Sequence, residues 1–154
     1  MIIALGCDHA GYPLKKLVHE RLAKLGHEVL NLGVDTEAVP ADYPDHARAV
    51  AEAVAQGKAS RGVVVCGSGV GATVAANKVP GARAAMCHDT FSARQGVEDD
   101  DLNVLCLGGR IIGSELAYEV LAAFLNAKFS GLERHERRKN KVLDIERHYA
   151  KGAK

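Results

Sequence analysis

The sequence predicts an α/β fold, with helices on both faces of a five-stranded parallel sheet. Five short apolar segments alternate along the chain with stretches whose apolar residues recur at helical spacing. At 154 residues the chain has the length of one domain, and no repeat, linker or low-complexity segment divides it. Strands that alternate with helices in this way are typical of a parallel sheet covered on both sides. We therefore expect a single-domain, Rossmann-like α/β/α sandwich.

The first half of the chain supplies two strands and two helices. The apolar run 2–6 predicts a strand. A helix follows from Pro13 to Gly26, because proline favours a first helical turn and glycine favours a helix end. The segment 27–34 predicts the second strand. After a polar loop, apolar residues recur every three or four positions through 47–54, which predicts the second helix.

The second half repeats this alternation and ends in a charged tail. The β-branched run 62–66 predicts a strand buried on both faces, and a glycine-rich turn and a helix of small residues follow it. The other expected elements are a strand over 82–87, a short helix over 90–97, a strand over 103–107 and a helix over 113–129. We expect residues 133–150 to form a basic helical tail of the single domain, which spans 1–154.

The composition argues against several functional classes. The net charge of +1 gives no general attraction to nucleic acid, and no apolar run is long enough to span a membrane. The first residues enter a strand directly, which is unlike a secretory signal. The four cysteines lie at or inside expected strands and none forms a Cys-x-x-Cys pair, which disfavours a disulfide scaffold or a zinc site. We expect a reduced, cytoplasmic protein without a bound metal.

The turn after the third strand is the strongest candidate for a ligand site. Its sequence over 66–71, CGSGVG, places three glycines in five positions just before a helix. Glycines let the backbone approach a ligand closely, and the free N–H groups of such a turn bind negative charge. Cys66 would direct a thiol at whatever those amides hold. A thiol beside a helix N-terminus is favoured as the thiolate.

Other interpretations of this turn fit less well. Gly67, Gly69 and Ala72 match the dinucleotide fingerprint, and Asp89 lies about 20 residues further on. That fingerprint normally opens the first strand–helix unit of a domain, whereas this turn falls in the middle of the chain. A cysteine phosphatase would need an arginine where Ala72 stands. A purely structural turn around a buried thiol is the remaining alternative, because buried free cysteines are common.

Polar residues follow the other expected strands as well. Because the carboxyl ends of parallel strands meet at one edge of a sheet, residues that follow separate strands come together there. In this chain they are Asp8 and His9 after the first strand, Tyr43 beyond the second, His88 and Asp89 after the fourth and Arg110 after the fifth. So many polar side chains at one edge predict a binding cleft.

Six short motifs occur in order over nearly the whole chain. They are GCDHAG at 6–11, DYP at 42–44, CGSGVG at 66–71, AANK at 75–78, NVL at 103–105 and GGR at 108–110. Together they resemble the type B ribose-5-phosphate isomerase family, and several separate motifs are far more specific than one glycine turn. The resemblance implies interconversion of ribose 5-phosphate and ribulose 5-phosphate, a step of the pentose phosphate pathway, without a metal or other cofactor.

The resemblance also implies a role for each matching residue. Cys66 would move a proton between C1 and C2 of the open-chain sugar, and the backbone amides of 67–71 would stabilise the enediolate. Some relatives carry a glutamate at the position of Ala72, so this chain resembles the cysteine subtype. The residues that would contact substrate are Asp8, His9, Tyr43, Gly67, Ser68, Gly69, Val70, Gly71, Asp100, Arg110, Arg134 and Arg138. Those that would take the phosphate are His9, Arg110, Arg134 and Arg138, whereas Asp8 would hold sugar hydroxyls.

In this family the arginines of the tail reach the site of a neighbouring subunit. The resemblance therefore implies a homodimer or homotetramer. Arg134 and Arg138 are four residues apart, so they share one face of the expected tail helix. Taken alone, a basic run of this kind is more often a solvated surface.

The chain departs from the family where the sugar ring is opened. Cysteine-type members carry a His-Asn-Asp-like segment whose histidine is credited with ring opening, and here these positions are Asp99, Asp100 and Asp101. Aspartate accepts a proton readily near pH 7 but is a poor donor unless it is buried. In our first hypothesis Asp99 or a nearby group, assisted by Ser68 or His88, still opens the ring of ribose 5-phosphate.

Two alternatives stay open at this point. The natural substrate could be a tetrose such as erythrose 4-phosphate, which has no furanose ring to open because its O4 carries the phosphate. The chain could also be a non-catalytic module that binds a nucleotide or a phosphosugar.

Overall fold

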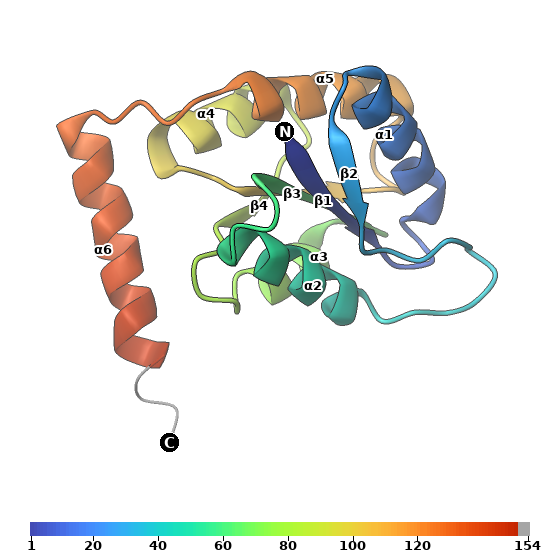
Figure 1. Ribbon diagram of the computed structural model, residues 1–154, viewed down its shortest axis with the longest axis horizontal. Coiled ribbons are helices and arrows are strands. Elements are labelled where there is room, and N and C mark those ends of the chain that lie inside the picture. Colours follow the sequence, from blue (N-terminus) through green and yellow to red (C-terminus); the bar gives the residue numbers. More distant parts are fainter. Residues whose placement is uncertain (151–154) are drawn as a thin grey trace.

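Residues 1–150, which the computed structural model describes, form a parallel sheet between two layers of helices (Figure 1). The strands are β1 (Ile2–Cys7), β2 (Glu28–Asn31), β3 (Arg61–Cys66), β4 (Ala84–Met86) and β5 (Val104–Gly108), and they pair in the order β2-β1-β3-β5-β4. The helices are α1 (Tyr12–Lys24), α2 (Tyr43–Ala55), α3 (Val70–Ala76), α4 (Thr90–Asp100), α5 (Ser114–Asn126) and α6 (Glu133–Ala150). The predicted fold class is confirmed, since every strand pairing is parallel. Residues 151–154 of the predicted domain lie outside the described residues.

The side chains of each central strand alternate between two hydrophobic cores. In β3, Val63 and Val65 pack in the core that α1, α4 and α5 cover, whereas Val64 and Cys66 pack in the core that α2 and α3 cover. Successive side chains of a strand point to opposite faces of the sheet, so a strand that is apolar throughout is buried on both faces. Cys66 therefore lies on the α2–α3 face, at the carboxyl end of the central strand.

The order of the strands leaves a crevice between β1 and β3. From β1 the chain moves outward through α1 to β2, and it then returns through α2 to β3 on the far side of β1. Figure 1 shows α1 on one face of the sheet with α4 and α5, and α2 on the other face with α3. In open sheets of this kind, ligands bind beyond the carboxyl ends of the strands where the order reverses.

The loop after β1 is held against the end of β3. A Cβ atom on Gly11 would lie 2.0 Å from the carbonyl oxygen of Val65, so only glycine permits this approach. The contact brings Asp8 and His9 beside Cys66, where all three line one hollow.

The edge strands are shorter than the sequence predicts. β2 stops at Asn31 rather than at residue 34, and β4 begins at Ala84 rather than at residue 82. Both strands lie at an edge of the sheet, so they have a partner on one side only. A single ladder of hydrogen bonds holds less of the chain in an extended conformation than two ladders do.

Helix α4 is longer than the sequence predicts. It continues past residue 97 to Asp100, and Asp101 ends it in a left-handed conformation with φ of 55°. The acidic segment before β5 therefore forms the last turn of a helix. This places Asp99 on a regular element rather than in a loop.

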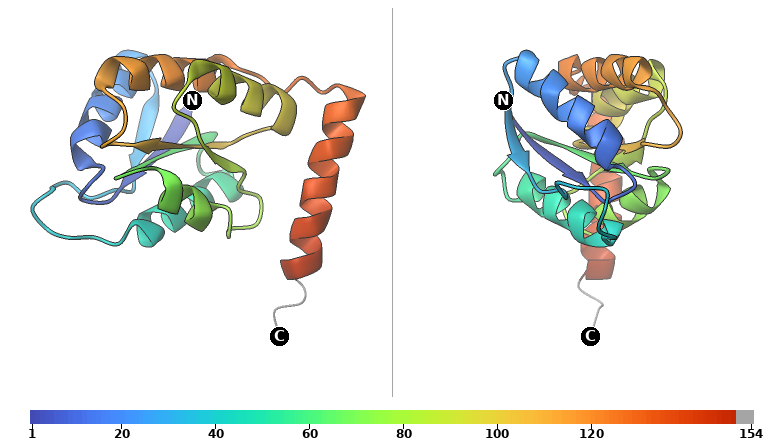
Figure 2. Two further views of the ribbon diagram at one scale, coloured as in Figure 1. Left: turned by 180° about the vertical axis from the view of Figure 1, so that it is seen from behind. Right: turned by 90° about the vertical axis from the view of Figure 1, so that its right-hand side faces the viewer.

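Helix α6 lies outside the two layers. Figures 1 and 2 show it at the opposite end of the molecule from the loop that follows β2. Glu146 ties the helix to the body, because its carboxylate accepts a hydrogen bond of 2.9 Å from the N–H of Gly81. Among the helices of residues 1–150, none combines the length and the apolar character that a membrane crossing requires.

Candidate active site

A hollow of about 420 Å³ opens at the carboxyl ends of β1, β3 and β5. The residues that line it are Asp8, His9, Ala10, Tyr43, Cys66, Gly67, Ser68, Gly71, Arg110 and Ile111. Most of the residues that the sequence predicts for the cleft therefore meet in one place. Sequence reasoning missed Ala10 and Ile111, the neighbours of His9 and Arg110, which supply small and apolar surface.

Cys66 sits at the floor of this hollow, with 4% of its surface exposed. Its Sγ accepts a hydrogen bond of 3.1 Å from the N–H of Gly69. The chain can turn back in this way because Gly69 adopts φ of 85°, and a Cβ there would lie 3.1 Å from the backbone carbon of Leu107. The predicted turn thus points at least one backbone donor at the sulfur.

The other three cysteines lie in different surroundings. Burial raises the pKa of Cys7 and of Cys87 to about 11 and the pKa of Cys106 to about 12, because a thiolate loses its hydration in the core. None of these three lines the hollow. Cys66 is therefore the thiol that is placed to meet a ligand.

Asp8 and His9 are both oriented by backbone groups. The buried carboxylate of Asp8 accepts a hydrogen bond of 2.8 Å from the N–H of Gly11 through Oδ1. Oδ2 has no hydrogen-bond partner within residues 1–150, so it can accept from a ligand hydroxyl. The Nδ1 of His9 lies 3.1 Å from the backbone nitrogen and 3.2 Å from the carbonyl oxygen of Ala41, so the ring is anchored through Nδ1.

Tyr43 and Arg110 form the walls of the hollow. The ring of Tyr43 rests on Gly71, where an added Cβ would lie 2.7 Å from the ring. The N–H of Arg110 donates to the carbonyl of Gly67 at 3.0 Å, so the arginine is fixed to the glycine turn. Within the described part of the chain, no carboxylate lies within ion-pair distance of its guanidinium. The guanidinium of Arg110 is therefore available to pair with an anion in the hollow.

Four residues that the sequence predicts for this edge do not line the hollow, namely Gly69, Val70, His88 and Asp89. Asp89 caps the start of α4, where its carboxylate accepts a hydrogen bond of 2.7 Å from the N–H of Ser92. Val70 follows Gly69 at the start of α3, and its N–H donates to the hydroxyl of Ser68 at 3.3 Å. His88 accepts a hydrogen bond of 2.9 Å from the N–H of Gly108 through Nε2, and burial lowers the pKa of its imidazole. His88 therefore supports the turn after β5 as a neutral ring.

The remaining predicted site residues lie away from the hollow, toward the amino edge of the sheet. Asp99 and Asp100 form the last turn of α4, which runs back from the carboxyl edge of the sheet to the amino edge. Asp99 accepts a hydrogen bond of 2.7 Å from the side-chain amide of Gln95. Arg134 and Arg138 lie in the first turns of α6, near this end of α4. One copy of the chain does not bring these residues to Cys66.

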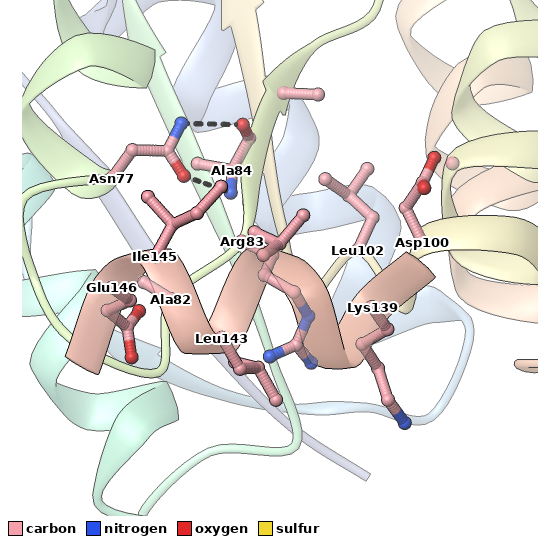
Figure 3. A pocket seen from close by; sticks show the side chains of 13 residues that line it. Asn77, Ala82, Arg83, Ala84, Asp100, Leu102, Lys139, Leu143, Ile145 and Glu146 are labelled. Atoms are coloured by element: carbon pink, nitrogen blue, oxygen red, sulfur yellow. Dashed lines mark hydrogen bonds between the residues drawn. The ribbon is translucent and has the colours of Figure 1, made fainter. Parts of the chain in front are cut away.

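A second hollow, of about 500 Å³, lies between α6 and β4 (Figure 3). Its charged lining residues are Arg83, Asp100, Lys139 and Glu146, and Leu102 and Ile145 supply apolar surface. It contains no nucleophile and no glycine turn, so the chemistry of the sequence motifs belongs to the smaller hollow. Within residues 1–150, no three His, Cys, Asp or Glu side chains gather as a metal site would require.

Comparison with known proteins identifies close relatives. Residues 3–142 match the family model described as Ribose/Galactose Isomerase. The ribose-5-phosphate isomerase B of Escherichia coli is 41% identical over 144 residues, which cover 94% of this chain and 95% of that protein. The D-erythrulose-4-phosphate isomerase of Pectobacterium atrosepticum is 42% identical over 129 residues, which cover 84% of this chain and 85% of that protein. The structure of ribose-5-phosphate isomerase B from Clostridium thermocellum superimposes with a TM-score of 0.94 at 44% identity, covering 97% of this chain and 99% of that one.

The environments of the four thiols predict different rates of alkylation. With iodoacetamide at pH 8, we expect Cys66 to be modified first and Cys7, Cys87 and Cys106 to stay unmodified while the chain is folded. A thiol whose pKa is about 11 is ionised in about one molecule per thousand at pH 8, and the thiolate is the reactive form. Peptide mass spectrometry over time measures the four rates.

The Cys66→Ala variant is the control and should take up no label in the folded state. In urea all four thiols of the parent chain should react. Modification of Cys7, Cys87 or Cys106 as fast as Cys66 in the folded protein would contradict the assignment.

Proposed function

This chain belongs to the ribose/galactose isomerase family, and from that membership we propose how its pocket isomerises a phosphosugar. The protein is an aldose–ketose isomerase that interconverts ribose 5-phosphate and ribulose 5-phosphate. The observation that supports the proposed mechanism most directly is the position of Cys66. Its sulfur lies in a hollow between a carboxylate, a cationic side chain and a turn of backbone amides.

We assign Cys66 as the base that moves the proton between the two carbons. As the thiolate, it takes the proton from C2 of the open-chain aldose. The electron pair of that C–H bond then forms the C1=C2 bond, and O1 gains the negative charge. The thiol returns its proton to C1 while the hydroxyl proton of O2 passes to O1, which leaves the ketone at C2. Such proton transfer by a positioned group contributes about 10²- to 10⁴-fold to the rate.

The glycine turn would stabilise the intermediate. Backbone N–H groups of 67–71 are fixed before the reaction begins. Those of Gly69 and Val70 already donate to the sulfur of Cys66 and to the hydroxyl of Ser68, and the others can meet the charge on O1 without reorganising. Ser68 lines the same hollow and would donate or accept at a sugar hydroxyl. The free Oδ2 of Asp8 is suited to accept from another sugar hydroxyl, and the ring of Tyr43 limits the width of the pocket.

The phosphate would bind at the cationic wall. The imidazole of His9 and the guanidinium of Arg110 both line the hollow, and neither forms an ion pair with a carboxylate among residues 1–150. Charge-assisted hydrogen bonds from arginine to phosphate are about twice as strong as neutral ones. These two side chains would hold the phosphate at one end of the sugar and leave C1 and C2 near the sulfur.

We propose that a second copy of the chain completes the site, as a homodimer or within a homotetramer. The end of α4 and the start of α6 lie away from Cys66, and they carry Asp99, Asp100, Arg134 and Arg138. A symmetric partner could bring its own copies of these four residues to the hollow that holds Cys66. Helix α6 also exposes large apolar side chains that a partner would cover, at Val142, Ile145 and Tyr149. In this arrangement Asp99 of one copy would serve ring opening, and the two arginines would add to the phosphate site of the other.

A tetrose phosphate is the second candidate substrate. The motivating observation is Asp99, which stands where an imidazole would open a furanose ring, together with a relative named D-erythrulose-4-phosphate isomerase. An acyclic tetrose phosphate would need only the base and the amides of the hollow. The third possibility, which the tests below also address, is a module that binds a phosphosugar without isomerising it.

Replacing the base should separate catalysis from binding. We expect Cys66→Ala to lower kcat for ribose 5-phosphate by about 10²- to 10⁴-fold, because no other thiol reaches the hollow. Dissociation constants for the phosphosugar, measured by calorimetry, should change by less than about threefold, since the phosphate contacts are elsewhere. Cys106→Ala is a matched control that removes a thiol from the same core. Full activity in Cys66→Ala would refute the mechanism, and an inactive parent chain that still binds phosphosugar would favour the module.

Mixed oligomers should show whether two copies share one site. Cys66→Ala and Arg138→Ala would each be nearly inactive alone, because every site lacks one needed group. Co-expressed in equal amounts, they should recover about a quarter of the parent activity, since half of the dimers are mixed and each mixed dimer has one intact site. Differently tagged copies allow the mixed species to be purified and assayed. No recovery in purified mixed dimers would mean that the arginine serves its own chain.

Asp99→His distinguishes the two sugars. If ribose 5-phosphate is the substrate, the parent chain should turn it over with a kcat/KM above that for erythrose 4-phosphate, and Asp99→His should alter this rate by less than about threefold. If the substrate is a tetrose, the parent should act poorly on the pentose, and the new imidazole should raise pentose turnover about 10²-fold without changing that of the tetrose. We expect the first result.

A further inference from the structure

His135 is a buried imidazole at the start of α6, with 4% of its surface exposed. The helix around it is otherwise highly charged and mostly exposed. The ring lies where the chain passes from α5 to α6 across the end of α4. A buried imidazole needs a hydrogen-bond partner for each nitrogen, and the partners of His135 determine its tautomer and orientation.

The Nε2 atom of His135 is bound to Arg134. The Nε–H group of Arg134 donates to it at 3.0 Å. Because an arginine has donors only, Nε2 must act as the acceptor, and the neutral ring then carries its proton on Nδ1. The bond uses the Nε–H of the guanidinium. Its two terminal NH2 groups have no hydrogen-bond or ion-pair partner among residues 1–150, so they can bind an anion. The guanidinium of Arg134 is thus held through its Nε atom.

The Nδ1 side of the ring is held as well. Nδ1 lies 2.6 Å from the hydroxyl oxygen of Ser130 and 3.4 Å from Oδ1 of Asp99. The other carboxylate oxygen of Asp99 is bound by Gln95. A flip of the ring would place carbon atoms against Ser130 and Arg134, so the orientation of the imidazole is determined at both nitrogens.

We propose that His135 is a positioning residue that fixes the guanidinium of Arg134, at a set distance from Asp99, for the phosphate of the substrate. The inference rests on the proposed function in one respect, that Arg134 is a phosphate ligand. His135 itself touches no substrate. It acts by presenting an arginine whose orientation is already determined, so that less side-chain freedom is lost when the phosphate binds.

Substitutions at position 135 that keep or remove the acceptor test this role. His135→Phe keeps a ring of similar size but accepts no hydrogen bond, whereas the Oε1 of glutamine can occupy the position of Nε2. We expect His135→Phe to raise KM for ribose 5-phosphate about tenfold with kcat within about threefold, because a hydrogen bond to a charged group is lost. His135→Gln should restore KM to within about threefold of the parent value. His148→Phe, an exposed position on the same helix, is the control and should leave both constants unchanged.

A measurement without turnover keeps this inference separate from the proposed function. Inorganic phosphate, titrated by calorimetry, should bind His135→Phe about tenfold more weakly than the parent or His135→Gln. If the parent chain binds phosphate in this pattern but does not isomerise ribose 5-phosphate, the proposed function fails and the role of His135 stands. Equal phosphate affinities in all variants, or a parent that binds no phosphate, would overturn the role of His135.

Stability is checked by melting temperature and oligomeric state. If His135→Phe does not fold, His135→Asn takes its place, because the shorter amide can meet Ser130 but does not reach Arg134. A merely structural residue would lower the melting temperature of these variants and leave KM and phosphate affinity unchanged in the folded fraction. That result would also overturn the proposal.

Discussion

The site depends on one steric condition, the contact between the loop after β1 and the backbone of β3. Position 11 has no side chain, and a Cβ there would lie 2.0 Å from the carbonyl oxygen of Val65. The same glycine donates its N–H to Asp8 at 2.8 Å, so the close approach also orients the carboxylate. Two segments that are far apart in the sequence are thereby joined into one hollow with Cys66 at its floor. The strand order reverses between β1 and β3, and the crevice at that point becomes a site only because this contact closes one side of it.

The alternation of strand side chains decides which thiol can react. Cys7 and Cys66 both end a central strand, and Cys7 pairs in register with Val65, one residue before Cys66. Cys7 consequently faces the core under α1 and α5, where burial raises its pKa to about 11. Cys66 faces the other side, where the glycine turn leaves room for a ligand. A shift of one residue in the register of β1 would turn Cys7 to the same face of the sheet as Cys66.

Much of this arrangement could be predicted from the sequence. The features that could not be predicted depend on contacts between residues that are far apart in the sequence. The strands and the residues after them follow from local patterns and from the rule that parallel strands end at one edge, which is why Asp8, Cys66 and Arg110 were predicted together. The burial of His135 leaves no such signal, because its neighbours in sequence are charged and its partners come from α4 and from the segment before α6. The length of α4 was also missed, since nothing in an acidic run distinguishes a last helical turn from a loop.

The fold separates the proposed chemistry into two groups that one chain cannot join. Strands of five or six residues separate the two edges of the sheet by about 15–20 Å, and Asp99 and Arg134 belong to the edge opposite Cys66. A long, flexible side chain delivered from a partner would lose about 0.5–1.5 kcal/mol of conformational freedom at each binding event. In our proposal Arg134 loses this freedom when the chain folds rather than when the phosphate binds, because its bond to Nε2 of His135 already orders the side chain. A phosphate that reaches the assembled site then meets a guanidinium already in place, so more of its binding energy is left to hold the sugar against the sulfur.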